Sequence, residues 1–346
     1  MMDLIATTER APGPGETVAG TGFRTAPGGK GANQAVQCAR LGAHVTMAGR
    51  VGDDAFGREA LQSVRTAGVD LSRVTADPSA PTGVAHILVE DTPQGVQNRI
   101  TIVPGANFTL TPADLAWMED GVRAFDMVLL QFELPMDVVE AAAGWAHAAG
   151  VPVMVNPAPA APISDRLLAC ADYLSPNEHE AAQLSGLPLR AGPEGVEAAD
   201  LERVAAWFRA RGVKELLVTL GENGAALAGT EGMLRVPCVP MERVADPTAA
   251  GDSFVGAFCT GLCAGLEREA ALAFASHAAA TGEFWKWQIA GSAEIIDIGN
   301  CANAVTHHID GLGKGLVITA ADDHAIRSKS ICPLHHLLHQ ISIFIA

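Results

Sequence analysis

The feature that most constrains the fold is an alternation of short apolar runs with amphipathic stretches of helical length. The apolar runs are almost continuously hydrophobic, as strands covered on both faces are, and they lie at residues 45–51, 127–131, 151–156 and 216–220. The alanine-rich stretches with helical periodicity lie at residues 32–40, 56–67, 135–149 and 199–211. This order predicts an α/β fold with a doubly wound, mostly parallel sheet, whose ligands gather at the carboxyl ends of the strands.

Two segments, at about residues 14–27 and 80–104, interrupt this rhythm. Both contain extended-looking sequence, "ETVAGTGFRTA" and "TGVAHILVEDTPQGVQNRITIV", and the second turns around residues 91–95 as a hairpin would. We expect them to form a small accessory β sheet that acts as a lid.

Composition excludes several classes of partner. With 23 basic and 39 acidic residues the formal charge is −16, which argues against general binding to nucleic acid or to a membrane surface. The seven cysteines have no CxxC pair or regular spacing, and neither a signal core nor a membrane-spanning stretch is visible. We therefore expect a cytoplasmic protein of the reducing compartment.

The stretch "VADPTAAGDSFVG" places small residues and an aspartate at the start of an apolar helix. The amides of Ala249, Ala250 and Gly251 can form an anion hole at such a helix N-terminus. Asp252 can then act as a general base that takes a proton from an attacking hydroxyl group. The alternative is that Asp252 only caps the helix, and these residues alone do not decide between the two.

A second glycine-rich turn, "PGGKGANQAVQ", also precedes a helix. Gly28 and Gly29 allow close backbone approach, Lys30 can reach an oxyanion, and Asn33 offers an amide to hydroxyl groups. The turn does not match the Walker A pattern. Glycine at a helix start also has purely structural uses, so this turn is ambiguous when taken alone.

The stretch "SPNEHEAAQLSG" ends a strand and opens a helix, with Asn177 and Glu180 on one face. A capping box explains this pattern well. The functional interpretation is that the two residues orient phosphate oxygens and water around Mg²⁺, which prefers oxygen ligands.

Other candidates follow strands. In "VTLGENGA", Thr219, Gly221 and Gly224 lie where a nucleotide can pass close to the backbone. Glu133 in "LLQFELP" and Asp3 in "MMDLI" are carboxylates at apolar strand ends. They are either acceptors for the hydroxyl groups of a polyol or solvated loop charges.

Together the motifs resemble the ribokinase-like carbohydrate kinases. The resemblance covers roughly residues 2 to 280 and rests on nine stretches in the family's order and spacing: "PGETV", "GGKGANQAV", "GDDAFG", "TGVA", "GAN", "NPAPA", "PNEHEA", "TLGENGA" and "AAGDSF". Any single motif is weak, whereas nine in order are very specific. "GGKGANQ" and "NPAPA" favour the ribose-phosphorylating members over fructokinase-like or nucleoside-kinase relatives.

The resemblance implies a Rossmann-like domain with a β lid that also forms the contact of a homodimer. It implies transfer of the ATP γ-phosphoryl group to the 5-hydroxyl of D-ribose, with Mg²⁺ as cofactor and K⁺ as activator. The residues that match the sugar-binding set are Asp3, Gly28, Gly29, Lys30, Asn33 and Glu133. Those that match the remaining roles are Asp252 as base, Ala249 to Gly251 as anion hole, Asn177 and Glu180 for phosphate and magnesium, Thr219, Gly221 and Gly224 for nucleotide, and Asp246 and Thr248 for potassium.

Both ends of the chain depart from the family pattern. The family has a central buried strand before the position of Asp3, so we expect unpaired backbone, exposed apolar surface and a mobile Asp3. After residue 280 the resemblance stops abruptly, which divides the chain into a kinase domain (1–280) and a divergent tail (281–346). One hypothesis is a frame-shifted or mis-joined tail with an internal methionine as the start; the other is a genuine divergent tail.

The resemblance leaves two rival functions. One is a kinase of the same fold that acts on another pentose, a ketose or a nucleoside. The other is an inactive relative that only binds sugar or nucleotide, since both ends of the chain depart from the family.

Overall fold

The computed structural model describes residues 1–92, 95–192, 195–240, 249–282 and 341–346. Its helices are α1 (Lys30–Arg40), α2 (Ala55–Thr66), α3 (Met118–Gly121), α4 (Met136–Ala149), α5 (Asp165–Cys170), α6 (Glu178–Ser185), α7 (Ala198–Arg209), α8 (Ala250–Cys263) and α9 (Arg268–Gly282). Short 3-10 turns are η1 (Gly105–Thr109), η2 (Pro112–Leu115), η3 (Val122–Ala124) and η4 (Gly221–Asn223). Within these residues no helix is long and apolar enough to cross a membrane.

A nine-stranded sheet forms the centre of the part of the chain that the structure describes. Its order is β14 (Gly232–Val236), β13 (Ala225–Gly229), β12 (Glu215–Thr219), β9 (Tyr173–Leu174), β8 (Val153–Asn156), β7 (Met127–Gln131), β15 (Ser342–Ile345), β3 (His44–Gly52) and β4 (Asp70–Asp77). The strands from β12 to β4 are parallel, and β13 and β14 add an antiparallel edge. The expected doubly wound α/β fold is confirmed.

Helices cover both faces of this sheet. Successive residues of β7 alternate between two apolar clusters: Met127 and Leu129 pack with α1, α8 and α9, whereas Val128 and Leu130 pack with α3, α4, α5 and α7. All of them are nearly inaccessible to solvent. This double burial explains why the strand sequences are continuously apolar rather than alternating.

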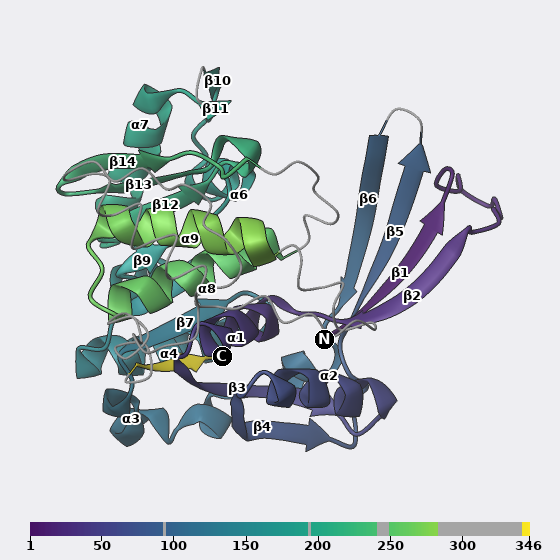
Figure 1. The fold of residues 1–346 in the computed structure, drawn as a ribbon. Coiled ribbons are helices and arrows are strands. Elements are labelled where there is room, and N and C mark those ends of the chain that lie inside the picture. The colour runs from purple at the N-terminus through teal and green to yellow at the C-terminus, as the bar shows by residue number, and fades with distance from the viewer. Residues whose placement is uncertain (93–94, 193–194, 241–248, 283–340) are drawn as a thin grey trace, which may run out of the picture.

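A second sheet has four strands in the order β2 (Gly22–Pro27), β1 (Met2–Thr8), β5 (Val84–Thr92) and β6 (Gly95–Val103). It extends away from the main body, with the N-terminus at its base (Figure 1). The sequence segments predicted for the lid contain β2, β5 and β6, and β1 joins them. A separate small hairpin pairs β10 (Ala191–Gly192) with β11 (Gly195–Val196).

The expectations about the missing strand are wrong in two respects. Asp3 is not on a loose terminus, because it pairs with Ala26 and Ala85 inside β1 and is 7% exposed. The sheet has no gap either, because β15 lies between β7 and β3 and pairs in parallel with both. A segment from residues that fall outside the resemblance therefore occupies the centre of the fold.

Candidate active site

The start of α1 brings the sugar-side candidates together. Asp3 lies so close to Gly28 that a Cβ atom there would be 2.2 Å from Asp3 Oδ1. Gly29 has φ 96°, a left-handed conformation that suits glycine, and it directs the chain into the helix. The two glycines are therefore required by close packing and by backbone geometry.

Glu133 follows β7 and closes this side. Its Oε2 atom accepts a hydrogen bond from the Lys30 amide at 2.7 Å, across 103 residues of sequence. Burial raises the pKa of Glu133; the Lys30 amide opposes this, and the nearby Asp252 carboxylate adds to it. The carboxylate thus lies in a low-dielectric environment, where its bonds to hydroxyl groups are strong.

Asp252 lies in the first turn of α8 and is 6% exposed. Asn33 Nδ2 donates to its Oδ2 atom at 2.9 Å, and Gln34 Nε2 donates to its Oδ1 atom at 3.3 Å. Two side-chain amides of α1 therefore fix the orientation of this carboxylate. A capping role alone does not require such an arrangement.

The N-terminus of α8 has free space beside Gly251 among the described residues. A Cβ atom at Gly251 would meet none of their atoms within 4 Å. Ala249, the N-cap residue, has φ 69°, an unusual value for a residue other than glycine. The first amides of a helix have no acceptor inside the helix, so this end can bind an anion.

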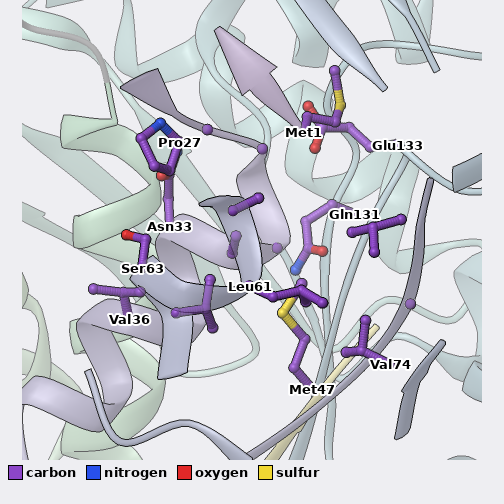
Figure 2. A pocket seen from close by; sticks show the side chains of 18 of the residues that line it. Met1, Pro27, Asn33, Val36, Met47, Leu61, Ser63, Val74, Gln131 and Glu133 are labelled. Atoms are coloured by element: carbon purple, nitrogen blue, oxygen red, sulfur yellow. The ribbon is translucent and has the colours of Figure 1, made fainter. Parts of the chain in front are cut away.

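Two cavities meet at this helix end. A cavity of about 140 Å³ is lined by the sugar-binding candidates Gly28, Gly29, Asn33 and Glu133, and it includes Ala249. A cavity of about 110 Å³ also includes Ala249 and is lined by Lys30, Asn177, Glu180, Thr219, Gly251 and Asp252. Figure 2 shows the first cavity, with the Asn33, Gln131 and Glu133 side chains around it.

Lys30 carries positive charge into the second cavity. Burial lowers the pKa of its ammonium group, but the carboxylates of Asp252, Glu133 and Glu180 together outweigh this and raise the pKa overall. Lys30 is thus a protonated cation beside Asp252, suited to stabilise the charge of a phosphoryl group.

Asn177 and Glu180 form a capping box at the start of α6. Asn177 Oδ1 accepts from the Glu180 amide at 2.8 Å, and Glu180 Oε2 accepts from the Asn177 amide at 2.9 Å. The capping alternative is therefore confirmed for both side chains. Both residues still line the second cavity.

Oxygen donors at this cavity fit Mg²⁺. No group of three or more metal-binding side chains exists among residues 1–92, 95–192, 195–240, 249–282 and 341–346. Nucleotide-bound Mg²⁺ does not need one, because it takes phosphate oxygens, waters and one or two carboxylates. The carboxylates of Glu180 and Asp252 line the same space.

The nucleotide candidates separate into two kinds. Thr219 ends β12, bridges to Asn177 and lines the second cavity. Gly221 has φ 57°, and a Cβ atom there would contact none of the described residues, whereas one at Gly224 would lie 1.9 Å from the Val236 carbonyl oxygen. Gly224 is therefore explained by packing against β14. Asp246 and Thr248 lie outside the described residues.

A buried amide network was not predicted from the sequence. Gln131 Nε2 donates to Gln34 Oε1 at 2.6 Å, and Gln34 Nε2 also donates to Asn156 Oδ1 at 3.1 Å. Asn156 Nδ2 in turn donates to the Ser175 carbonyl oxygen. The only available signal was a polar residue at the end of each apolar run, Gln131 and Asn156.

The site thus combines a carboxylate held by amides, a cation, and a helix N-terminus that borders two cavities, as expected for phosphoryl transfer to a hydroxyl group. Comparison with known proteins agrees. The model of the pfkB family of carbohydrate kinases matches residues 1–281. This chain belongs to that family and is a carbohydrate kinase.

Within the carbohydrate kinases, this chain is similar to several ribokinases. The chain is 39% identical over 278 residues to the ribokinase of Bacillus subtilis, covering 80% of this chain and 88% of that protein. It is 39% identical over 285 residues to the ribokinase of Schizosaccharomyces pombe, covering 80% of this chain and 87% of that one. The structure of the Arabidopsis thaliana ribokinase complexed with ribose and ATP superposes with a TM-score of 0.75 at 32% identity, covering 88% of this chain and 95% of that chain.

Proposed function

We propose that this chain transfers the γ-phosphoryl group of ATP to the 5-hydroxyl of D-ribose, giving D-ribose 5-phosphate and ADP. The observation that carries this is the position of Asp252, which lines the second cavity and is held by two amides, one of them from Asn33 of the first cavity. Support for ribose comes from the ribokinases of two organisms, each 39% identical to this chain. Deoxyribose has weaker support, since the deoxyribokinases are 35% identical to this chain.

The reaction divides between the two cavities. The sugar occupies the side of Asp3, Gly29 and Glu133, where carboxylates accept hydrogen bonds from its hydroxyl groups. Asp252 takes the proton of the 5-hydroxyl group while the oxygen of that hydroxyl group bonds to the γ-phosphorus. The bond from the γ-phosphorus to the oxygen that bridges it to the β-phosphorus breaks, which releases ADP. Lys30 and the amides of residues 249–251 stabilise the negative charge on the transferring group.

Mg²⁺ belongs to the proposal because ATP is used as its magnesium complex. Glu180 and the phosphates of ATP would hold the ion, which would neutralise part of the charge of the triphosphate. K⁺ activation through Asp246 and Thr248 rests on the resemblance of "DPTAAGD" to the family motif. The reaction is expected to stop with EDTA and to recover with Mg²⁺, and to run faster in K⁺ than in Na⁺.

A homodimer formed through the lid is also proposed. Ile100 and Ile102 of β6 lie opposite the buried Ile87 and Ala85 of β5, yet are 52% and 37% exposed. They extend an apolar row that a second lid can cover. Ile100→Arg is expected to shift the molecular mass in light scattering from dimer to monomer; an unchanged mass would exclude this contact.

A cytoplasmic location is also proposed, because the seven cysteines show no CxxC pair or regular spacing.

The direct test is ribose-dependent ADP release by the purified chain. Two-dimensional NMR of the product is expected to show phosphorus coupled to the protons of carbon 5. A panel of deoxyribose, fructose and nucleosides tests the rival substrates. Higher kcat/KM for any of these than for ribose would replace the assignment.

A further inference from the structure

The last strand of the molecule, β15, joins two blocks of the central sheet. On one side it pairs with β3, with Ile343 opposite Val45, and on the other with β7, with Ile343 opposite Met127. Among the described strands, β3 and β7 each pair with β15 and not with each other. The slot that β15 occupies is thus built by segments of sequence more than 200 residues away from it.

Side chains of this segment are buried on both faces. Ile343 and Ile345 enter the cluster beneath α1 and α8, whereas Phe344 and Ala346 enter the cluster beneath α3 and α4. Ile343, Phe344 and Ile345 are each 0% exposed. The Phe344 ring packs edge-on against Trp117 at 5.3 Å between centroids, and the Phe125 ring is 5.5 Å away.

Hydrogen bonds at both ends of β15 fix its register in the sheet. The Asp126 carboxylate accepts from the Ser342 amide at 2.7 Å, while the Asp126 amide donates to the Ser342 carbonyl oxygen at 2.7 Å. At the far end the Ala346 amide donates to the Leu129 carbonyl oxygen at 3.2 Å. Since a slip by one residue would exchange the two faces, this clamp selects one register.

The carboxyl end of β15 reaches the sugar side of the site. Ala346 lines the cavity of about 140 Å³ together with Gly28 and Glu133. Ile345 lies beneath the start of α1, with its Cγ2 atom 3.7 Å from the position of a Cβ atom on Gly31. The cavity that contains Asp252 and Thr219 has no β15 residue in its described lining.

We propose that the slot between β3 and β7 is a docking surface for residues 341–346, and that docking of this segment assembles the sugar cavity. The occupant is an extended apolar strand, Ile-Ser-Ile-Phe-Ile-Ala, that buries both faces and lies parallel to both neighbours. Because docking and sugar binding share α1 and Ala346, each stabilises the other by linkage. The sugar half of this inference rests on the proposed function; the docking half does not.

Hydrogen exchange of the full chain tests docking without any activity. The amides of residues 342–346 are expected to exchange far more slowly than in an unstructured peptide, and more slowly still when ribose is added. Exchange at the peptide rate would overturn docking. Protection that falls on dilution would also overturn it, since the strand would then come from a second copy.

A matched pair of variants tests the coupling to sugar. Ile343→Ala and Leu227→Ala each truncate a side chain that is 0% exposed and belongs to the same apolar cluster, but only Ile343 lies in β15. Ribose calorimetry is expected to give a Kd raised about tenfold for Ile343→Ala, with that of Leu227→Ala near the parent value. If Ile343→Ala does not fold, Ile343→Val serves in the same comparison. Equal ribose affinity in both variants would overturn the coupling.

The same measurements separate this inference from the function. A parent chain that protects residues 342–346 but binds no ribose would remove the sugar assignment and its coupling, while the docked strand would stand. A chain that binds ribose while residues 342–346 are unprotected would remove the docked strand and its coupling to sugar, while the sugar assignment would stand.

Discussion

Two helices that pack side by side, α1 and α8, both begin at this site, and their N-termini are completed in opposite ways. At α1 the first amide, that of Lys30, donates to the Glu133 carboxylate at 2.7 Å. At α8 no atom of the residues that the structure describes lies within 4 Å of a Cβ position on Gly251, and the carboxylate of Asp252 is held by side-chain amides of α1. One helix end is thus neutralised by the protein itself, and the other is the end that the proposed function assigns to the phosphoryl group.

In the proposed function, this difference lets one site bind both a sugar and a phosphoryl group. A helix end that already has a carboxylate partner offers acceptors and suits a neutral polyol, whose hydroxyl groups donate. An unpartnered helix end attracts a phosphoryl group. Lys30 joins the two, because its amide belongs to the first end and its side chain to the second cavity.

The largest effect is expected at the open helix end. Asp252→Asn keeps the shape and the neighbouring amides but removes the base, so kcat is expected to fall by about 10²–10⁴-fold with the KM for ribose nearly unchanged. Steady-state kinetics checks this. Asp165→Asn is the control, because Asp165 also lies in a first helical turn but its side chain is 81% exposed. Comparable turnover in both variants would contradict the role of Asp252 as base.

Substitution at the N-terminus of α1, where Glu133 accepts from the Lys30 amide, is expected to affect sugar binding rather than turnover. Glu133→Ala removes the partner of the Lys30 amide and an acceptor for sugar hydroxyl groups, which costs about 1.5–3 kcal/mol for charge-assisted bonds. The KM for ribose is therefore expected to rise roughly 10- to 100-fold, with a smaller change in kcat. Glu119→Ala, on the exposed side of α3, is the matched surface control. An unchanged KM in Glu133→Ala would remove Glu133 from the sugar site.

Glu133 also makes stability depend on pH. Burial raises the pKa of Glu133 in the folded protein, so the folded state binds more protons than the unfolded state above the ordinary glutamate pKa of about 4.3. Stability from this group is present below that value and is lost as pH rises through the folded pKa. Glu133→Gln cannot lose a proton, so its melting temperature relative to the parent is expected to increase from pH 4.5 to pH 8. A constant difference across this range would contradict the burial effect.

Local features of this molecule could be predicted from the sequence, whereas contacts across it could not. The apolar run 127–131 coincides with β7, and the stretch 135–149 matches α4 within one residue, because periodicity records burial directly. The glycine turn and the AAGD stretch likewise indicated the starts of α1 and α8, because small residues at a helix start are a local sequence signal.

The remainder depends on long-range pairing. Gln34 contacts residues 97, 122 and 218 positions away, and no local pattern encodes such a network. The run at 341–346 is apolar, but its own sequence does not indicate that it pairs with β3 and β7, which are more than 200 residues away. For this reason the gap expected in the sheet was a wrong prediction, although the sequence to fill it was visible.

The smallest effect concerns the backbone of the open helix end. Ala249 has φ 69°, which costs a residue with a Cβ atom about 1–2 kcal/mol, whereas glycine adopts it freely at an unfolded-state cost of about 0.5–1 kcal/mol. Ala249→Gly is therefore expected to stabilise the protein by up to about 1 kcal/mol. Ala250→Gly, at the first residue of α8, is expected to destabilise it by up to about 1 kcal/mol, because glycine is a poor helix former. Urea unfolding of the two variants checks the opposite signs. If both destabilise, Ala249 is not held in the left-handed conformation, and the amides at this end are not arranged for an anion.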